Sequence, residues 1–356
     1  MDFAKAFDVI DRNLLIKKLS LYRINDDHVE LIKSFLTNRQ QRVYYNNKLS
    51  CELPLNYGVP QGSNLGPILF SIYINDLPLY ISNECDMFAD DTTIHTSNKN
   101  LTVISSELQT NVNELLQWTE LNHMALNPKK TKRMLITTRQ RRQNIKENMK
   151  EIKVNNTIIE DIESHKLLGV IVDNNLSWSP HISNLSKKVS SKVYALNRIK
   201  HMLDTKCRKL YFQAYIQSLT DYASTLWDGA SNETMRHIRS LYKRGLKIVI
   251  SKNKITNDDY KAHEILPFDK RLCFNKASMV HRCIHGNAPK LLSAKFSSKS
   301  QRNSNKLHTK TPRIDLSKTN FSYSGAKLWN AIPFEIRNIK NTSNFKKKYK
   351  QYLIES

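Results

Sequence analysis

The sequence contains no long apolar run. Its longest apolar stretch, residues 68–74, is far shorter than the roughly 20 residues that a helix needs to cross a bilayer. The chain begins Met-Asp-Phe-Ala-Lys, which has neither the apolar centre nor the cleavage site of a signal peptide. We therefore expect no membrane partner and a protein that stays inside the cell, in either the nucleus or the cytoplasm.

Cysteine is also scarce. The five cysteines form no C-x-x-C pair, which disfavours both a disulfide framework and a zinc ribbon. Cys283 lies between His281 and His285, but this alternate spacing inside a predicted helix points the three side chains in different directions. A metal site there is therefore disfavoured.

Acidic residues are too few to balance the basic ones. The 56 Lys and Arg against 32 Asp and Glu leave a formal charge of +24 on 356 residues. Such an excess predicts a polyanionic partner. The length is enough for two or three domains, and 40% hydrophobic residues are ordinary for a globular protein with a core.

Residues 1–140 alternate helical and strand patterns, which predicts an α+β domain with helices packed on one face of an antiparallel sheet. Two polar turns and an acidic pair interrupt the apolar periodicity. The segments predicted in this domain are helices within 12–36, a hairpin at 41–53, a loop at 58–67, an apolar helix to about 80, a hairpin at 85–96, a helix at 101–124 and a strand at 133–138.

The rest of the chain changes character after a basic loop at 139–150. Short strands at 152–159 and 166–173 precede an almost wholly helical region from 179 to 250, so residues 141–250 are predicted to form a second domain. Residues 251–356 form a third region of unknown role. Helices are expected there at 268–286 and 345–354, with a surface loop at 293–310.

Three acids have the chemistry of a catalytic centre. Asp2 lies in a strand-like start, and Asp90 and Asp91 are predicted at a hairpin tip. Together they could hold two divalent ions, as nucleotidyl transfer requires. An Asp-Asp pair in a turn is usually only solvated, but adjacent like charges after an apolar strand are poorly placed without a cation.

The segment 58–70 decides between these interpretations. It reads G-V-P-Q-G-S-N-L-G-P-I-L-F, with glycines that let the backbone approach a ligand and the start of a helix. In order and spacing, D-F-A-K-A-F-D at 2–8, this segment, and F-A-D-D at 88–91 resemble motifs A, B and C of the reverse transcriptase polymerases. Three ordered motifs within about ninety residues make a chance match improbable.

The resemblance extends further and is most similar to the jockey-like non-LTR retrotransposons. L-N-P-K-K-T at 126–131 resembles motif D, and the region around Leu168-Gly169 and Leu176-Ser177-Trp178 resembles the primer grip. The end of motif B, the phrase at 72–78 and L-W-N-A-I-P at 328–333 point to the jockey-like kind. The resemblance implies a right-hand polymerase palm at 1–140, a primer grip and mostly helical thumb at 141–250, and a C-terminal helical region.

Carried onto this sequence, the resemblance implies that Asp2, Asp90, Asp91 and the Phe3 carbonyl ligate Mg²⁺, for which Mn²⁺ can substitute. Phe7 falls at the steric-gate position, which implies a DNA product; it could instead be a plain core residue. Gln61 and Gly62 would lie along the incoming nucleotide and the template base. Lys130 is the better candidate for the motif D lysine, and Lys129 and Lys132 are alternatives; each could also belong to a solvated basic face.

Basic residues with interleaved aromatics recur in the predicted thumb. Lys187, Lys188, Lys192 and Arg198 are the candidates to contact nucleic-acid phosphates. The nearby aromatics Tyr194, Tyr211 and Trp227 are expected to face the domain core. The implied partners are an RNA template, a DNA primer or target, and deoxynucleoside triphosphates.

The start of the chain departs from the family pattern, since no fingers precede motif A. We expect an N-terminal truncation at motif A, which would leave Asp2 close to a fraying end. An RNA-directed DNA polymerase is the leading hypothesis, and a truncated remnant that binds nucleic acid without extending a primer is the alternative. An intron-encoded maturase fits motif B less well, and Phe7 disfavours an RNA-dependent RNA polymerase.

Overall fold

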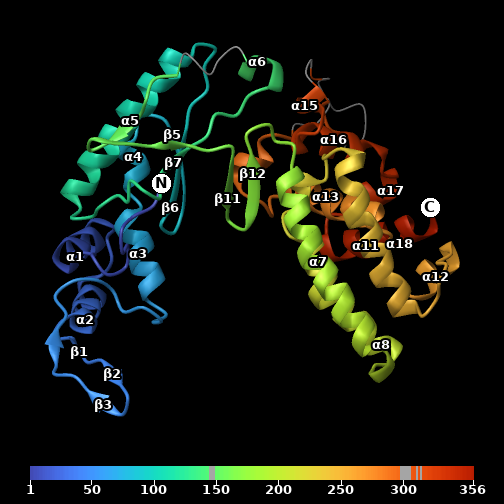
Figure 1. Cartoon of the computed structure of the whole chain (residues 1–356), viewed down its shortest axis with the longest axis horizontal. Coiled ribbons are helices and arrows are strands. Elements are labelled where there is room, and N and C mark those ends of the chain that lie inside the picture. Colours follow the sequence, from blue (N-terminus) through green and yellow to red (C-terminus); the bar gives the residue numbers. More distant parts are fainter. Residues whose placement is uncertain (144–148, 297–305, 310–311, 313–314) are drawn as a thin grey trace. The chain divides into compact units, whose positions relative to one another are not determined.

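The computed structural model describes residues 1–143, 149–296, 306–309, 312 and 315–356. The chain divides into two compact units, Met1–Glu163 and Ser164–Ser356, which are coloured blue to green and green to red in Figure 1. Each unit has its own apolar core. The division falls inside the range 141–250 that the sequence predicts for the primer grip and thumb.

The first unit is a mixture of helices and short strands. Its helices are α1 Arg12–Leu21, α2 Asp26–Leu36, α3 Gly66–Ile74, α4 Leu77–Tyr80, α5 Leu101–Leu121 and α6 Arg139–Gln143. Its strands are β1 Gln40–Gln41, β2 Tyr44–Tyr45, β3 Lys48–Leu49, β4 Leu53–Pro54, β5 Glu84–Phe88, β6 Asp91–His95, β7 Lys132–Arg133, β8 Lys153–Val154, β9 Thr157–Ile158 and β10 Glu160–Asp161.

Local chemistry sets where these helices begin. The side chains of Asp11, Asn25 and Asn100 accept hydrogen bonds from backbone N–H groups in the first turns of α1, α2 and α5, which satisfies donors that have no partner within the helix. Proline occupies the first turn of α3 and of α4, where its missing N–H costs nothing. The apolar helix predicted up to residue 80 is therefore two helices, separated at Asn75 and Asp76.

The described strands pair two by two and do not form one wide sheet. β5 and β6 make the longest hairpin, with Glu84 opposite His95 and Phe88 opposite Asp91. β1 pairs with β4, β2 with β3 and β8 with β9, all antiparallel, whereas β7 and β10 run parallel. The Asn46-Asn47 and Asn155-Asn156 turns have positive φ angles, a conformation that asparagine tolerates. Both turns confirm the predicted hairpins.

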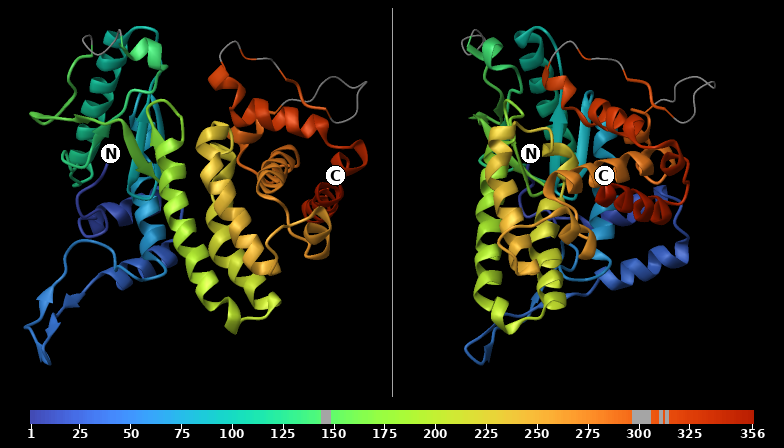
Figure 2. Two further views of the ribbon diagram at one scale, coloured as in Figure 1. Left: turned by 45° about the vertical axis from the view of Figure 1, so that its right-hand side comes forward. Right: turned by 90° about the vertical axis from the view of Figure 1, so that its right-hand side faces the viewer.

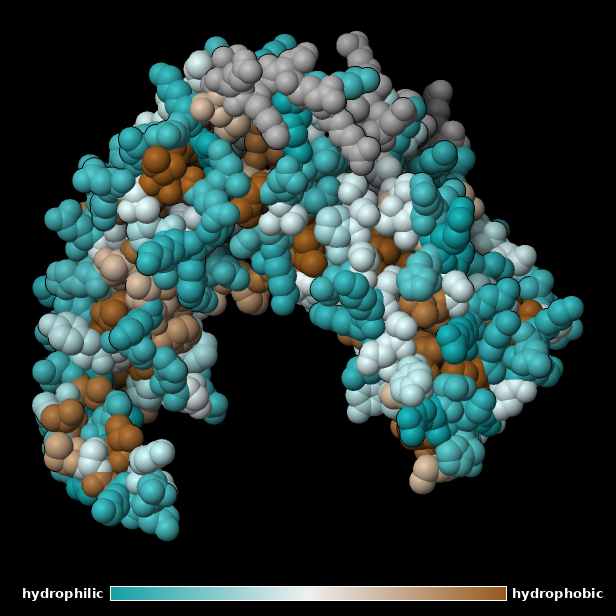
Figure 3. Space-filling view, in the orientation of Figure 1, coloured by the Kyte–Doolittle hydropathy of each residue, from teal (hydrophilic) through white to brown (hydrophobic). Residues whose placement is uncertain are grey.

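The core of the first unit gathers side chains from the chain start and from α1 to α5. Phe3, Ile10, Phe70 and Trp118 are buried together there. Side chains of the β1–β4 region are instead largely exposed, and Figure 3 shows hydrophobic residues at the surface of this hairpin, at the lower left. The helices thus form the packed part of the unit, and the hairpin extends from it.

The second unit is mostly helical after the β11 Ser164–Leu167 and β12 Val170–Asp173 hairpin. Its larger helices are α7 Ser179–Ile199, α8 Thr205–Phe212, α11 Asn232–Ile250, α12 Asn257–Ala262, α13 Phe268–Ile284, α16 Phe321–Ala331 and α18 Thr342–Glu355. Shorter turns are the 3₁₀ helix Lys200–Met202, the π-helix Gln213–Gln217, α9 Ser218–Asp221, α10 Ser224–Trp227, α14 Lys290–Ser293, α15 Asp315–Lys318 and α17 Phe334–Arg337.

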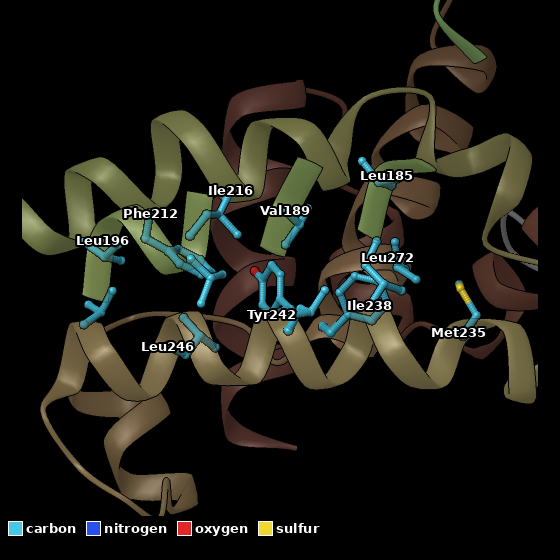
Figure 4. Close-up of a cluster of buried hydrophobic side chains, with 14 of the residues drawn as sticks. Leu185, Val189, Leu196, Phe212, Ile216, Met235, Ile238, Tyr242, Leu246 and Leu272 are labelled. Atoms are coloured by element: carbon cyan, nitrogen blue, oxygen red, sulfur yellow. The ribbon is translucent and has the colours of Figure 1, made fainter. Parts of the chain in front are cut away.

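Helices α7 and α11 pack side by side, as the views of Figures 1 and 2 agree. Figure 4 shows that the two helices run in the same direction. Both run from right to left in this view, α7 from Leu185 to Leu196 and α11 from Met235 to Leu246. A second cluster joins α13, α16 and α18 around the buried Trp329. Helical periodicity therefore predicts this unit well.

Several expectations can now be compared with the structure. The mixed helix and strand class is confirmed, as are the helices near 268–286 and 345–354. The strand predicted at 133–138 is wrong beyond Arg133, and α6 occupies part of the predicted basic loop. Much of the loop predicted at 293–310 lies outside the described residues. Among those described, no helix is long and apolar enough to cross a membrane.

Candidate active site

The site is built where the chain start lies between two other segments. The N-terminal ammonium group of Met1 donates to Thr92 O at 2.6 Å, and the Thr92 backbone N–H donates to Met1 O at 3.3 Å. On the opposite side, Ala4 N–H donates to Ala125 O at 2.8 Å, and Asn127 N–H donates to Asp2 O at 2.9 Å. Residues 1–4 therefore lie between β6 and the segment that leads into motif D.

This pairing orients the Phe3 backbone. Phe3 faces Leu126 as an isolated antiparallel bridge, and the hydrogen bonds are made by the residues on either side of that pair. In such a non-hydrogen-bonded pair the carbonyl points away from the partner segment. The Phe3 carbonyl thus points toward the edge where Met1 pairs with Thr92, while its ring is buried near Trp118.

The Asp90-Asp91 pair lies at the predicted hairpin tip. Phe88 and Asp91 close the β5–β6 ladder, and Ala89 turns the chain with φ 52°. Asp90 is half-buried and Asp91 is exposed. Burial lowers the pKa of the Met1 amino group, and the charges of Asp91 and Asp2 act against that shift. The hydrogen bonds between Met1 and Thr92 bring the chain start to the residue next to Asp91 in sequence.

Lys130 is the motif D lysine that reaches Asp2. Its Nζ lies 3.1 Å from Asp2 Oδ2, and this oxygen is buried without a hydrogen bond of good geometry. Lys132 instead pairs with Glu160. Lys129 is exposed and forms no ion pair within the described ranges. The geometry favours Lys130 over the two alternatives.

Motif B lies directly against the second half of motif A. Gln61 Nε2 donates to Asp8 Oδ1 at 2.9 Å, and the Phe7 ring stacks on Phe70 with centroids 4.5 Å apart. Gly58 has φ +80°, and a Cβ there would lie 2.8 Å from Asp8 O. Only glycine allows this approach. Gly62 also has φ +80°, but the space around its Cβ position is open.

Two basic residues of α1 hold this region together, and sequence reasoning missed both. The Arg12 guanidinium donates to three backbone carbonyls of the loop that leads into α3, those of Leu55, Tyr57 and Gly58. Three carbonyls at 2.5 to 2.9 Å match the fork of donors that arginine presents. The sequence signal available was only an arginine at the helix start, which is too common to single out.

Lys18 is the other missed residue. Its ammonium is buried, donates to Tyr73 O at 2.6 Å and pairs with Asp76 at 2.9 Å. It also lies over the Tyr73 and Trp118 rings. Burial lowers the pKa of Lys18, and the hydrogen bond and charge of Asp76 oppose this. Lys18 therefore ties α1 to the junction of α3 and α4.

Oxygen donors suited to magnesium are present, but their side chains do not surround one common point. Carboxylates and a carbonyl are the ligands that Mg²⁺ prefers, and Asp2, Asp90, Asp91 and Phe3 supply them. Among the residues that the structure describes, no three His, Cys, Asp or Glu side chains gather closely enough to hold a metal ion. The residue types fit the ion, whereas the arrangement of these side chains does not by itself form its site.

Comparison with known proteins identifies the first part of the chain. The family model for reverse transcriptase (RNA-dependent DNA polymerase) matches residues 1–172. Residues 1–172 belong to the reverse transcriptase family. The matched range contains motifs A to D and extends to the β11–β12 hairpin. The family resemblance that the sequence motifs indicate is thereby confirmed.

Curated proteins that are similar to this chain come from mobile elements. The RNA-directed DNA polymerase from mobile element jockey of Drosophila melanogaster is 26% identical over 259 residues, covering 69% of this chain. A probable RNA-directed DNA polymerase from transposon BS of the same organism is 24% identical over 263 residues, covering 70%. The chain spans only 27% and 28% of these two relatives. Both support the jockey-like, non-LTR assignment.

The region predicted to be the primer grip forms a loop held by hydrogen bonds. The Asp173 carboxylate accepts hydrogen bonds from the backbone N–H groups of Asn175, Ser177 and Trp178, which fixes the turn that precedes α7. At the other end of the hairpin, Tyr222 Oη donates to Leu168 O at 2.6 Å. Asp173 is another residue that the sequence did not single out.

The four predicted phosphate-binding residues lie on α7 and belong to the second unit, whereas the acidic residues belong to the first. Lys187, Lys188 and Arg198 are exposed, and Lys192 is half-buried. The Arg198 guanidinium lies 5.9 Å from the Tyr194 ring centroid, and Tyr194 is 59% exposed, so the expectation that this tyrosine faces the core is wrong. Trp227 is fully buried, as expected.

A second aromatic contact lies beside Lys192. Its Nζ is 5.8 Å from the centroid of the Tyr215 ring, and that ring contacts Tyr211, with centroids 4.8 Å apart. Tyr211 is half-buried, and Tyr215 is 51% exposed on the π-helix. π-Helical turns are frequent at functional sites. Sequence reasoning missed Tyr215, because nothing in the local pattern predicts a π-helix.

Proposed function

We propose that this chain supplies the palm and thumb of an RNA-directed DNA polymerase of a non-LTR retrotransposon. Residues 1–140 would form the palm, residues 141–250 the primer grip and thumb, and residues 251–356 a further helical region. The observation that carries the proposal is the pairing of residues 1–4 with Thr92 on one side and residues 125–127 on the other. It brings motif A between motif C and motif D.

The reverse transcriptase family uses divalent metal ions. We propose Mg²⁺, with Mn²⁺ as a substitute, held by Asp2, Asp90, Asp91 and the Phe3 carbonyl. Bound there, the ions would activate the primer 3′-hydroxyl and stabilise the leaving pyrophosphate. The pairing supports this, because it joins Met1 to Thr92, the neighbour of Asp91, and the Phe3 carbonyl points toward that same edge.

The other residues near these acids have supporting roles in the proposal. Lys130 balances the charge of Asp2, and its exposed side chain can reach an outgoing pyrophosphate. Phe7, supported by Phe70, would exclude a ribose 2′-hydroxyl. Gln61 and Gly62 would lie along the incoming deoxynucleoside triphosphate and the template base, on a loop that Gly58 holds against motif A.

In the second unit, Lys187, Lys188, Lys192 and Arg198 would contact phosphates of the RNA template and DNA primer. Three of them are exposed on α7 and Lys192 is half-buried there, which suits contacts that carry affinity without sequence information. The excess of +24 charges supports a polyanionic partner.

A second candidate function has an observation of its own. Because no three acidic, histidine or cysteine side chains gather as a metal site within the described residues, the chain could bind an RNA–DNA hybrid without extending it. This alternative predicts salt-sensitive binding and no synthesis, even with Mn²⁺.

Primer extension separates the two functions. The chain is incubated with oligo(dT) annealed to poly(rA), with Mg²⁺ and then with Mn²⁺, beside the Asp90→Asn, Asp91→Asn variant. The polymerase proposal expects extension that falls more than about 100-fold in the variant, because both substitutions remove ligand charge. No extension by the parent chain, together with tight hybrid binding, would support the binding function instead.

A further inference from the structure

The guanidinium of Arg12 contacts three carbonyls of one loop. It donates to Leu55 O at 2.5 Å, to Tyr57 O at 2.9 Å and to Gly58 O at 2.9 Å. Burial lowers the pKa of this guanidinium, and the charge of Arg39 acts in the same direction; no acidic group among the described residues opposes them. A partly buried charge without a carboxylate needs hydrogen bonds to stabilise it. The loop carbonyls are therefore the partners of this charge.

The same loop lies against the backbone of motif A. Gly58 N–H donates to Ile10 O at 2.8 Å, and Val59 N–H donates to Phe7 O at 3.0 Å. A Cβ at Gly58 would lie 2.9 Å from Phe7 O, a separation that only glycine allows. Arg12 therefore holds a segment that contacts Phe7 directly.

The position of the Phe7 ring also depends on this loop. The ring stacks on Phe70 with centroids 4.5 Å apart, and Phe70 lies on α3, into which the loop leads. Gln61, further along the same loop, donates to Asp8 Oδ1 at 2.9 Å. A shift of residues 55–59 would thus move both the backbone and the ring of Phe7. A misplacement of about 1 Å is enough to change a rate roughly 100-fold.

Arginine suits position 12 better than lysine. Its planar fork presents N–H donors in fixed directions, whereas lysine carries a compact ammonium on a flexible stem. Nε, Nη1 and Nη2 of Arg12 each donate to a different carbonyl, between residues 55 and 58. A lysine here would keep the positive charge and lose this set of contacts.

We propose that Arg12 is a positioning residue that sets the preference of the site for deoxyribose over ribose, by fixing the loop at 55–59 against the backbone of Phe7. The inference rests on the proposed function, since it requires that Phe7 excludes the 2′-hydroxyl. It adds the residue that keeps Phe7 in place for that task.

Nucleotide binding without bond formation tests the proposal. The chain is mixed with Mg²⁺ and poly(rA) annealed to an oligo(dT) primer that ends in a dideoxynucleotide, so that no extension is possible. Either dUTP or UTP is added, and heparin then captures protein that leaves the hybrid. Retention against nucleotide concentration gives an apparent Kd for each nucleotide. Because dUTP and UTP differ only in the 2′-hydroxyl, the ratio of the two Kd values measures the sugar preference.

One conservative variant and two controls are compared. Arg12→Lys should lower the preference for dUTP about threefold or more, because the loop is no longer fixed. Arg23→Lys makes the same substitution at an exposed residue just beyond α1 and should leave the preference unchanged. Leu19→Ala removes a fully buried side chain of α1. It should lower the urea midpoint through its cavity without changing the preference.

Two further variants show whether Arg12 acts through Phe7. Phe7→Ala should lower the preference by itself, and adding Arg12→Lys should lower it no further, because both changes act on the same ring. Gly58→Ala displaces the loop while Arg12 is intact and should also lower the preference. It therefore tests the role of the loop even if Arg12→Lys does not fold.

The outcomes separate this inference from the proposed function. An unchanged preference in folded Arg12→Lys or in Gly58→Ala would overturn the inference, and so would an equal loss in Leu19→Ala, since lost stability would then explain the effect. An unaltered preference in Phe7→Ala, or additive losses in the double variant, would overturn it as well. If the parent showed no nucleotide-dependent retention, both the inference and the proposed nucleotide site would be refuted. Retention with the expected preferences but no primer extension would refute only the proposed polymerase chemistry.

Discussion

The two units of the chain are stabilised in different ways. In the first, segments far apart in sequence meet through specific polar contacts, such as Arg12 on the loop at 55–58 and Lys18 on Asp76. In the second, α7 and α11 share a large apolar cluster with their neighbours, as Figure 4 shows. The polar contacts of the first unit thus depend on particular residues, whereas the packing of α7 on α11 in the second follows from helical periodicity.

This difference explains why function is easier to infer from the first unit. Chemistry that must hold a nucleotide needs glycines, acids and amides at fixed spacing, and such patterns are recognisable. A helical bundle needs only apolar residues at intervals of three and four, and many sequences satisfy that. The family model matches residues 1–172, which contain all four motifs.

Shortening a buried side chain in the helical core of the second unit should have the largest effect on stability. Leu246 is fully buried in the α7–α11 cluster, so Leu246→Ala should lower the free energy of unfolding by about 3 kcal/mol. Urea unfolding, with hydrogen exchange to follow each unit, measures the change. Leu226→Ala is the matched control, because Leu226 is 51% exposed. Equal losses in the two variants would contradict a core-dominated second unit.

The first unit should instead be sensitive to a single methyl group at a glycine. Gly58→Ala places a Cβ 2.8 Å from Asp8 O at a positive φ. It should lower the free energy of unfolding by about 2 kcal/mol more than the same substitution at a matched glycine without a close neighbour. Gly62→Ala provides that match, since it has the same φ of +80° and open space. Its cost should be limited to backbone strain, about 1 kcal/mol. Similar urea midpoints for both variants would refute the close approach of motifs A and B.

Nucleotide choice tests whether Phe7 is more than a packing residue. Phe7→Ala should raise the use of ribonucleotides relative to deoxyribonucleotides by about tenfold or more in primer extension, because the clash with the 2′-hydroxyl is removed. Phe35→Ala, which removes another partly buried ring from the same cluster, controls for lost packing. Unchanged discrimination in Phe7→Ala would leave it as a core residue stacked on Phe70.

Sequence reasoning predicts the elements of both units better than their connections. The Asn46-Asn47 turn, the β5–β6 hairpin and α7 follow from local patterns. The break between α3 and α4 differs from the single predicted helix, although the polar residues Asn75 and Asp76 and the following Pro78 mark it in the sequence. The single palm sheet expected from the resemblance is represented here by two-stranded pairs and isolated hydrogen bonds, since strand pairing depends on contacts far apart in sequence.

Sequence reasoning is limited in the same way at the candidate active site. Motif spacing predicts which residues meet nucleotides, and the structure places Asp2 beside Lys130 and Gln61 beside Asp8. Arg12, Lys18 and Asp173 could not be singled out, because their partners are mostly backbone carbonyls or N–H groups. A carbonyl acceptor carries no residue identity, so sequence patterns cannot reveal it.

Mild acid should lower the free energy of unfolding of the second unit through His281. This is the smallest of the four predicted effects. Burial lowers the pKa of this imidazole below its usual value of about 6.5; the hydrogen bond to Ile339 O raises it, and the charges of His285 and Lys346 lower it. The unfolded chain therefore binds a proton that the folded chain does not. Stability is present above about pH 6.5 and is lost as the pH falls below it.

His281→Gln tests this directly, because glutamine can still donate to Ile339 O but cannot titrate. Between pH 7.5 and 5.5 the variant should lose less unfolding free energy than the parent, by under about 1 kcal/mol, as urea unfolding measures. His201→Gln, at an exposed position, should behave like the parent. An unchanged pH dependence in His281→Gln would mean that the cluster around Phe345 and Trp329 opens enough to protonate the ring without unfolding. The second unit would then open locally around His281.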